Sequence, residues 1–317
     1  MVPLHPAAHG RREKQGERTM NPSDIWIVTL GYNHIDDTLE CLQSLAASEG
    51  GPYTLLFGDN ASGDGSPEKV REAFPQALVL ENGANLGFAK GFNEGLKYAA
   101  AHGAQWVFMI NNDTIVDPAC VKALLADAEA HPEAGIWVPK ILYYADRNVI
   151  WSVGSRFRAF PPAVVMRGTR HPDDGSFDGQ RVLQYATSCA FLMSRRFLQE
   201  VGLLDGDYFI MCDDYDLCIR AGEAGFAIRL VPEARMWHKV SKSTGVGTPN
   251  PFFWKQYGRS TAILFRKHAK HRWLTGPVAF LYILARMAVE GHRYGLRPFL
   301  EGWREGRRAA LSPPPRI

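Results

Sequence analysis

Three carboxylates crowd into a four-residue stretch, at Asp213, Asp214 and Asp216. Apolar side chains at helical spacing follow them, so the stretch starts a helix, where the helix dipole tolerates negative charge. Asp216 and Arg220 stand four residues apart on one helix face and are expected to form an ion pair. Asp213 and Asp214 then remain to face a cavity, unless they act only as helix caps. A carboxylate in a cavity accepts a proton from an attacking hydroxyl group.

Three more polar clusters each follow an apolar run that is typical of a buried strand. They cover residues 29–33, 59–65 and 111–114. Ligands bind at the carboxyl ends of strands in open parallel sheets, so we expect one shared site at that edge. Each cluster alone is also compatible with a turn rich in Asx and Gly residues.

The cluster that begins at Asn111 has the residue types of a metal site. The amide of Asn111 and the carboxylate of Asp113 are two residues apart and can point the same way. Hard oxygen ligands suit Mg²⁺ or Mn²⁺, which in turn bridge diphosphate oxygens. The alternative is an Asx turn that caps a helix beginning near Pro118.

A glycine-rich segment, residues 82–93, enters a further helix and is a candidate phosphate site. Gly87 allows close backbone approach, the helix N-terminus offers N–H groups, and Lys90 adds a positive charge. The alternative is close helix packing through small residues. The segment matches neither the dinucleotide-binding GxGxxG pattern nor the P-loop pattern, which disfavours NAD and P-loop enzymes.

Short apolar runs alternate with amphipathic runs, which predicts an α/β fold with a mostly parallel central sheet flanked by helices. Residues 148–184 break this rhythm and predict hairpins with a flexible loop. We expect strands at 25–30, 53–57, 76–80, 106–110, 135–143, 182–194 and 226–231, the last ended by Pro232. We expect helices at 36–47, 87–101, 195–201 and 214–225, others opened by Pro67 and Pro118, and only helices after Pro251.

The order of these motifs resembles the inverting glycosyltransferases of family 2, which have the GT-A fold, and especially their rhamnosyltransferase-like branch. The resemblance covers about residues 24–245, and its motifs are specific as a set. The matching pieces are Tyr32-Asn33, residues 59–66, 85–93, 111–114, 202–205 and 213–220, and His238.

The resemblance also implies roles for single residues. The DXD-type motif of the family falls on residues 111–113, so Asp113 binds the metal, and His238 matches a downstream histidine ligand. The catalytic base of the family matches Asp214, although the pair reads Asp-Asp here, which keeps Asp213 as an alternative. The donor-binding residues implied are Thr29, Asn33, Asp59 and Asn60 for the nucleoside, Asn85, Gly87 and Lys90 for the diphosphate, and Asn111 and Asn112 beside the metal.

The implied reaction is a single displacement with inversion, dependent on Mg²⁺ or Mn²⁺. A sugar passes from a nucleotide-diphosphate donor, dTDP-rhamnose or a UDP-sugar, to a hydroxyl of a glycan or lipid-linked saccharide in cell-wall or polysaccharide biosynthesis. One alternative is a catalytically degenerate nucleotide-sugar or carbohydrate-binding protein, which Asn111 favours. Another is a sugar-1-phosphate nucleotidylyltransferase, but its basic Gly-rich loop after the first strand is missing.

Length and composition suit an enzyme of this size. The 317 residues are 46% hydrophobic and 22% charged, with a net charge of +3, which excludes a disordered chain. Five scattered cysteines without a CxxC pair predict reduced thiols and a cytoplasmic protein. We expect a disordered lead at 1–22, a GT-A catalytic domain at 23–245 and a helical, basic region at 246–317.

Basic residues concentrate near the end of the chain. From Lys255 onward there are 13 Lys and Arg against 3 acids, so this part carries +10 and the remainder −7. The apolar run 278–285 is shorter than the roughly 20 residues that span a bilayer. Its basic and aromatic neighbours suit a helix lying in the interface, so we expect peripheral contact through 255–310 with the inner face of the plasma membrane. The alternative is packing on the main domain, and no nucleic-acid-binding motif is present.

Overall fold

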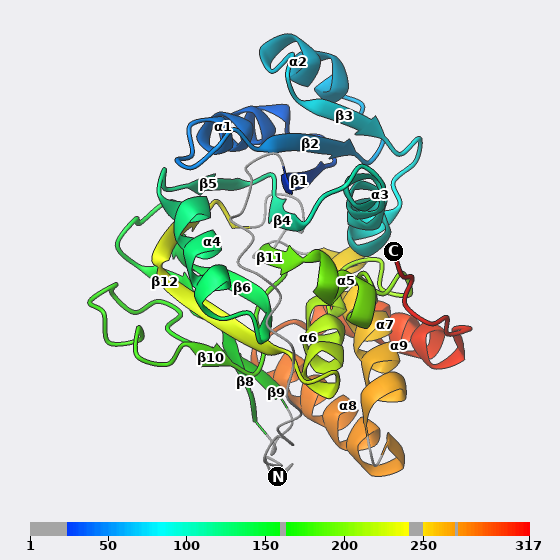
Figure 1. Cartoon of the computed structure of the whole chain (residues 1–317). Coiled ribbons are helices and arrows are strands. Elements are labelled where there is room, and N and C mark those ends of the chain that lie inside the picture. The colour runs from blue at the N-terminus through cyan, green and yellow to red at the C-terminus, as the bar shows by residue number, and fades with distance from the viewer. Residues whose placement is uncertain (1–23, 159–162, 241–249, 270–271) are drawn as a thin grey trace.

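The computed structural model describes residues 24–158, 163–240, 250–269 and 272–317 (Figure 1). The predicted lead at 1–22 and the predicted boundary at 245 lie outside these residues. The strands are β1 Ile25–Gly31, β2 Thr54–Asp59, β3 Leu78–Glu81, β4 Trp106–Asn111, β5 Thr114–Val116, β6 Ala134–Tyr143, β7 Ile150–Ser152, β8 Ser155–Arg158, β9 Ala163–Met166, β10 Val182–Leu183, β11 Ala190–Ser194 and β12 Ala227–His238. The helices are α1 Ile35–Ala46, α2 Ser66–Ala73, α3 Gly87–Ala101, α4 Cys120–Ala130, α5 Arg195–Val201, α6 Asp213–Glu223, α7 Pro251–His268, α8 Arg272–Val289 and α9 Leu296–Arg308, with a 3₁₀ turn at Arg293–Gly295.

The central sheet has the strand order β10-β12-β6-β11-β4-β1-β2-β3. Strands β3, β2, β1, β4, β6 and β12 run in one direction, and β11 lies antiparallel between β4 and β6. The α/β prediction of a mostly parallel sheet flanked by helices is therefore confirmed.

Side chains alternate between the two faces of the sheet, and each face has its own core. Trp26 and Val28 of β1 join Phe92 of α3 in one cluster. Ile25 and Ile27, from the same strand, join residues of α1 and α4 in the other. Strands buried on both faces read as continuous apolar runs, which is why the sequence predicted them.

The strand at the site is longer than predicted. Pro232 does not end it, because β12 continues to His238 and remains paired with β6. The register shifts between Val231 and Arg235, and this irregularity accommodates a proline that has no N–H to donate. The continued strand carries His238 to the edge of the sheet.

The predicted strand at 182–194 is also wrong as one element. It divides into β10, which pairs with β12, and β11, which lies inside the sheet. The residues between them hold Ser188 close to the end of β4, because Asn111 N donates to Cys189 O at 2.9 Å. This break brings Ser188 to the polar edge.

The region after Pro251 is helical, as predicted, and α7, α8 and α9 share an apolar cluster (Figure 1). Helices α7 and α9 approach closely at glycines: a Cβ on Gly302 would fall 1.9 Å from Lys255 O. The chain then returns to the main domain, where Leu203 N donates to Pro315 O at 2.8 Å. The helical appendage is thus joined to the α/β part of the fold.

Candidate active site

The ends of β1, β2 and β4 lie side by side at one edge of the sheet. Gly31 is in register with Asp59, and Leu30 is in register with Asn111. The three polar clusters of the sequence therefore meet in space. The α1 turn completes the edge, because Asn112 Nδ2 donates to Thr38 Oγ1 at 2.8 Å.

The loops after β1 and β2 are bonded to one another. Asn33, in the left-handed region with φ 59°, donates its N–H to Ser62 Oγ at 2.7 Å and accepts from Gly63 N at 2.9 Å. Asp59 Oδ2 accepts from Ser62 N at 3.0 Å, but its buried Oδ1 has no hydrogen bond. That oxygen is a free acceptor suited to an N–H of a base.

Thr29 lies inside β1, two residues before its end, and is almost fully buried. Its Oγ1 has no hydrogen-bond partner. Contact between Thr29 and a nucleoside stays a prediction.

Asn60 and Asn85 hold the start of α3. Asn60 Nδ2 donates to Gly87 O at 3.0 Å, and Asn85 Oδ1 accepts from Gly87 N at 3.0 Å. Phe88 N donates to Phe209 O at 2.6 Å. The first two N–H groups of α3 are thus already bonded, so this geometry favours a positioning role for the helix start.

Gly87 is required for that positioning. Its φ is +78°, and a Cβ would fall 2.5 Å from Phe209 O. The loop that carries Phe209 leads directly to α6, so Gly87 couples the α3 start to the carboxylate cluster. The sequence also allowed that the small residues of α3 serve close packing, and the structure shows such packing. A Cβ on Gly95 would fall 2.6 Å from Val28 Cγ1.

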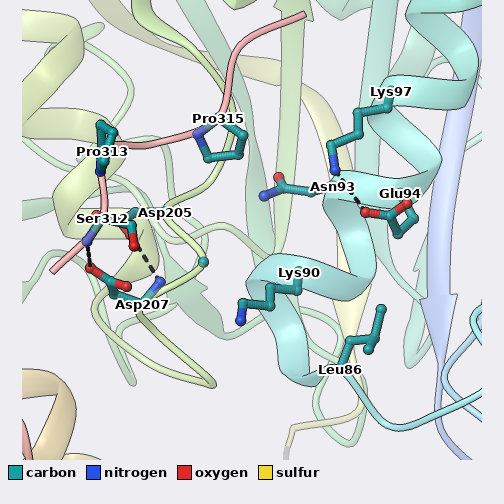
Figure 2. Close-up of a pocket in the computed structure, with 11 residues that line it drawn as sticks. Leu86, Lys90, Asn93, Glu94, Lys97, Asp205, Asp207, Ser312, Pro313 and Pro315 are labelled. Carbon is teal, nitrogen blue, oxygen red and sulfur yellow. Dashed lines mark hydrogen bonds and ion pairs between the residues drawn. The ribbon is translucent and has the colours of Figure 1, made fainter. Parts of the chain in front are cut away.

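Lys90 lies one turn into α3 and lines a cavity of about 280 Å³ between α3, the Asp205–Asp207 loop and the C-terminal tail (Figure 2). A Cβ added at Gly206 would fall 3.0 Å from Lys90 Cε. A role for Lys90 beside a diphosphate stays a prediction.

The metal-ligand candidates meet because β5 pairs with β12. Thr114 is in register with His238, and Asp113 Oδ1 lies 3.2 Å from His238 Nε2. The edge of the Trp151 ring system packs against the His238 ring, with centroids 4.5 Å apart. Burial alone would raise the pKa of Asp113, but His238 outweighs it and lowers that pKa. Burial opposes a charged His238, yet the neighbouring Cys189 and Asp113 raise its pKa above the usual range.

Several buried polar atoms here lack hydrogen bonds. They are Asn111 Oδ1 and His238 Nδ1, while Asp113 Oδ1 has only the contact with His238 at 3.2 Å. Buried polar atoms without partners are rare, and a cation that enters the site would satisfy the two oxygens. In the described part of the chain no group of three or more His, Cys, Asp and Glu side chains is arranged to hold a metal ion. Mg²⁺ is usually held by few protein ligands, and substrate oxygens complete its coordination. Asp113, His238 and Asn111 therefore fit a divalent cation.

The two candidate bases differ in burial. Asp213 is 2% exposed and accepts from Ser188 Oγ at 3.0 Å, whereas Asp214 is half-buried. Met211 and Cys212, with φ 67° and 66°, turn the chain sharply just before them. Burial raises the pKa of Asp213 to about 6, and burial together with the charge of Asp213 raises the pKa of Asp214 well above its usual range. Asp213 thus anchors α6, and Asp214 is the more accessible of the two carboxylates.

The predicted ion pair of Asp216 is confirmed. Arg220 Nε lies 2.7 Å from Asp216 Oδ2, and His268 Nε2 of α7 lies 2.7 Å from Oδ1. Sequence reasoning missed His268, because no spacing links α6 to α7. The appendage therefore contacts the helix that carries the candidate base.

Residues 26–202 match the family model "Glycosyl transferase family 2", which is more than half of the chain, and the chain belongs to this family. It is 28% identical over 243 residues to the N-acetylglucosaminyl-diphospho-decaprenol L-rhamnosyltransferase of Mycobacterium tuberculosis, covering 69% of this chain and 77% of the relative. It is 22% identical over 233 residues to the dTDP-rhamnosyl transferase RfbF of Shigella flexneri, covering 72% and 74%. The prediction of a rhamnosyltransferase-like member of family 2 is confirmed.

Solved structures share the fold at low identity. GalNAc-T7 with UDP, GalNAc and Mn²⁺ matches with a TM-score of 0.62 and 15% identity, over 90% of this chain and 55% of that one. The mannosyltransferase PcManGT from Pyrobaculum calidifontis, with GDP-Man and Mn²⁺, matches with a TM-score of 0.54 and 15% identity, over 92% and 90%. The GT-A fold is therefore confirmed, and the chain is a glycosyltransferase.

Proposed function

We propose that this enzyme transfers a sugar from a nucleotide-diphosphate donor, with dTDP-rhamnose favoured, to a hydroxyl of a lipid-linked saccharide with inversion. The observation that carries the proposal is the sheet edge at which Asp113 and His238 meet, with Asp214 tied to the same edge through Asp213 and Ser188. The names of the two rhamnosyltransferase relatives support the donor and the acceptor class.

Each group at the edge has a distinct task. Asp59 Oδ1 accepts from the nucleoside base, and the bonded loops of Asn33 and Ser62 shape that pocket. Asp214 takes the proton of the acceptor hydroxyl as its oxygen attacks the anomeric carbon, and the nucleoside diphosphate leaves. Asp113 and His238, with the amide of Asn111, would hold a divalent cation. When bound, the cation offsets the negative charge on the diphosphate oxygens.

The proposal is tested by nucleotide release. The purified chain, with Mg²⁺ or Mn²⁺, receives a panel of dTDP-, UDP- and GDP-sugars with a lipid-linked saccharide acceptor. We expect release of one nucleoside diphosphate, lost with EDTA, and an inverted product anomer by NMR. A chain that binds a nucleotide sugar with metal-dependent thermal stabilisation, yet turns over no donor with any acceptor, would instead be the degenerate binding protein.

We also propose that α8 contacts an anionic membrane surface. In the described part of the chain no helix is both long and apolar enough to cross a bilayer. Helix α8 packs inward through Ile283 and Met287 and leaves Leu281 63% and Val289 88% exposed. Arg293 and Arg297, both exposed, follow α8 and complement anionic lipid, although Arg297 also pairs with Glu301 at 3.0 Å.

Some basic and aromatic residues of the predicted membrane surface are engaged inside the protein. Arg266 donates to Gly306 O and Ala309 O, Lys267 pairs with Asp205 and Asp207, and Trp303 is buried. These three residues serve the packing of the appendage, and Lys270 lies outside the described residues. The proposed contact therefore rests on α8 and the turn that follows it.

Replacing Leu281 and Val289 by Asp should weaken binding to anionic liposomes in co-sedimentation, because two apolar contacts become negative charges. We expect a loss of about 10-fold or more in the partition coefficient. Val182→Asp, which changes an exposed valine of β10, is the matched control and should bind normally. Equal sedimentation of all three proteins would contradict a membrane contact at α8.

A further inference from the structure

A second cavity, of about 240 Å³, lies beside the β8–β9 hairpin. Its polar lining includes two arginines, Arg156 and Arg167, together with Thr169 and His171. None of the residues predicted from sequence lies in it. The cavity is therefore separate from the predicted donor site.

The two arginines have no acidic partner among the described residues. Arg167 is half-buried, and among the described residues its guanidinium group donates to Val153 O, at 3.3 Å. Burial and the neighbouring charge of Arg156 lower the pKa of Arg167. Asp173 and Asp178, on the following loop, lie 2.5 and 2.7 Å from the buried amine of Lys140. The guanidinium pair thus remains unneutralised, which suits an anionic ligand.

The cavity adjoins the reaction centre on two sides. Thr169 Oγ1 donates to Trp151 O at 3.0 Å, and the Trp151 ring packs on His238. On the other side Ser155 N donates to Tyr185 O at 2.8 Å, and the Tyr185 ring meets that of Tyr215, next to Asp214. Trp151 thus contacts both the cavity-lining Thr169 and His238, and Tyr185 contacts both Ser155 of β8 and Tyr215 of α6.

The cavity also lies away from the nucleoside loops. Those loops follow β1 and β2, whereas the hairpin follows β7, which pairs with β6 in the other half of the sheet. An anion in the cavity would therefore belong to the acceptor half of the site. The M. tuberculosis relative has a diphosphate in the name of its acceptor.

We propose that Arg156 and Arg167 bind the phosphate or diphosphate group through which the acceptor saccharide is linked to its lipid. The inference rests on the proposed function and deepens it. Guanidinium groups bind phosphate oxygens through paired, charge-assisted hydrogen bonds. The cavity would hold the anionic linker while the sugar hydroxyl reaches Asp214.

The test compares two acceptors that carry the same saccharide, one on an alkyl diphosphate and one on an uncharged alkyl chain, with metal in excess. In the double variant Arg156→Gln, Arg167→Gln we expect KM for the diphosphate acceptor to rise by about 10-fold per arginine. KM for the uncharged acceptor and for the donor should not change. Arg170→Gln, an exposed arginine outside the cavity lining, is the control. An equal loss with both acceptors, or no loss with either, would overturn the proposal.

A binding measurement separates this inference from the proposed function. A fluorescent alkyl diphosphate without any sugar is titrated into the full chain without donor, and inorganic pyrophosphate is the competitor. Binding that is lost in the double variant supports the cavity even where no donor is turned over. Competition by pyrophosphate would show that the phosphates are the recognised group, and lack of competition would contradict recognition of the phosphates by the arginines. Equal binding by wild type and double variant would refute the site.

Discussion

Asp214→Asn should lower kcat by on the order of 10²-fold or more while leaving the affinity for the donor nearly unchanged. The amide has the shape of the carboxylate but does not accept the proton of the acceptor hydroxyl. Donor affinity is preserved because the nucleoside loops and the metal candidates lie on other elements. Steady-state rates of nucleoside diphosphate release, with donor binding measured calorimetrically, check both parts.

Asp213→Asn is the matched control for that variant. Its amide oxygen still accepts from Ser188 Oγ, so α6 keeps its anchor. We expect a loss of less than about 10-fold in kcat, since only the accessible carboxylate has the proton-accepting role. A larger loss in Asp213→Asn than in Asp214→Asn would reverse the assignment of the base.

The pH profile of kcat/KM gives an independent measure of the same group. A base acts only when deprotonated, so the rate falls as pH drops through its pKa. Because burial and the charge of Asp213 raise the pKa of Asp214, the acid limb should lie above the usual aspartate range, about 3.9. Removing that charge in Asp213→Asn should move the limb to lower pH.

Asp113→Asn should also reduce transfer by on the order of 10²-fold or more, since the site loses its accessible acidic ligand and the leaving diphosphate loses charge compensation. Mn²⁺ binding, followed by EPR, should weaken in the same variant. His238→Gln should show a smaller loss in both measurements, because the anionic ligand remains.

Asp36→Asn is the control for the metal variants. Asp36 is an exposed carboxylate in the first turn of α1, close in sequence to the loop of Asn33, and should leave both readings unchanged. Full activity of Asp113→Asn in the presence of EDTA would refute metal assistance at this edge. If Asp113→Asn lost Mn²⁺ binding but transferred the sugar at the normal rate, the bound metal would not take part in the reaction.

The α/β class, most of the helices and strands, and the set of polar clusters could be predicted from the amino-acid sequence. These features are local: buried strands read as apolar runs, amphipathic helices as periodic runs, and site loops as polar residues at strand ends. The pair of Asp216 and Arg220 was equally local, because a four-residue spacing fixes neighbours on a helix.

The contacts between these elements could not be predicted from the sequence and come from the folded structure. The bulge around Pro232 let β12 reach the edge and place His238 against Asp113, although proline predicts the end of a strand. The hydrogen bond from Ser188 distinguishes the buried Asp213 from the more accessible Asp214. The pairing of His268 with Asp216 connects the appendage to the helix that carries both. Arg156 and Arg167 became a candidate site through the cavity that they share. Each of these contacts joins residues that are far apart in the chain, so their spacing in the sequence does not predict it.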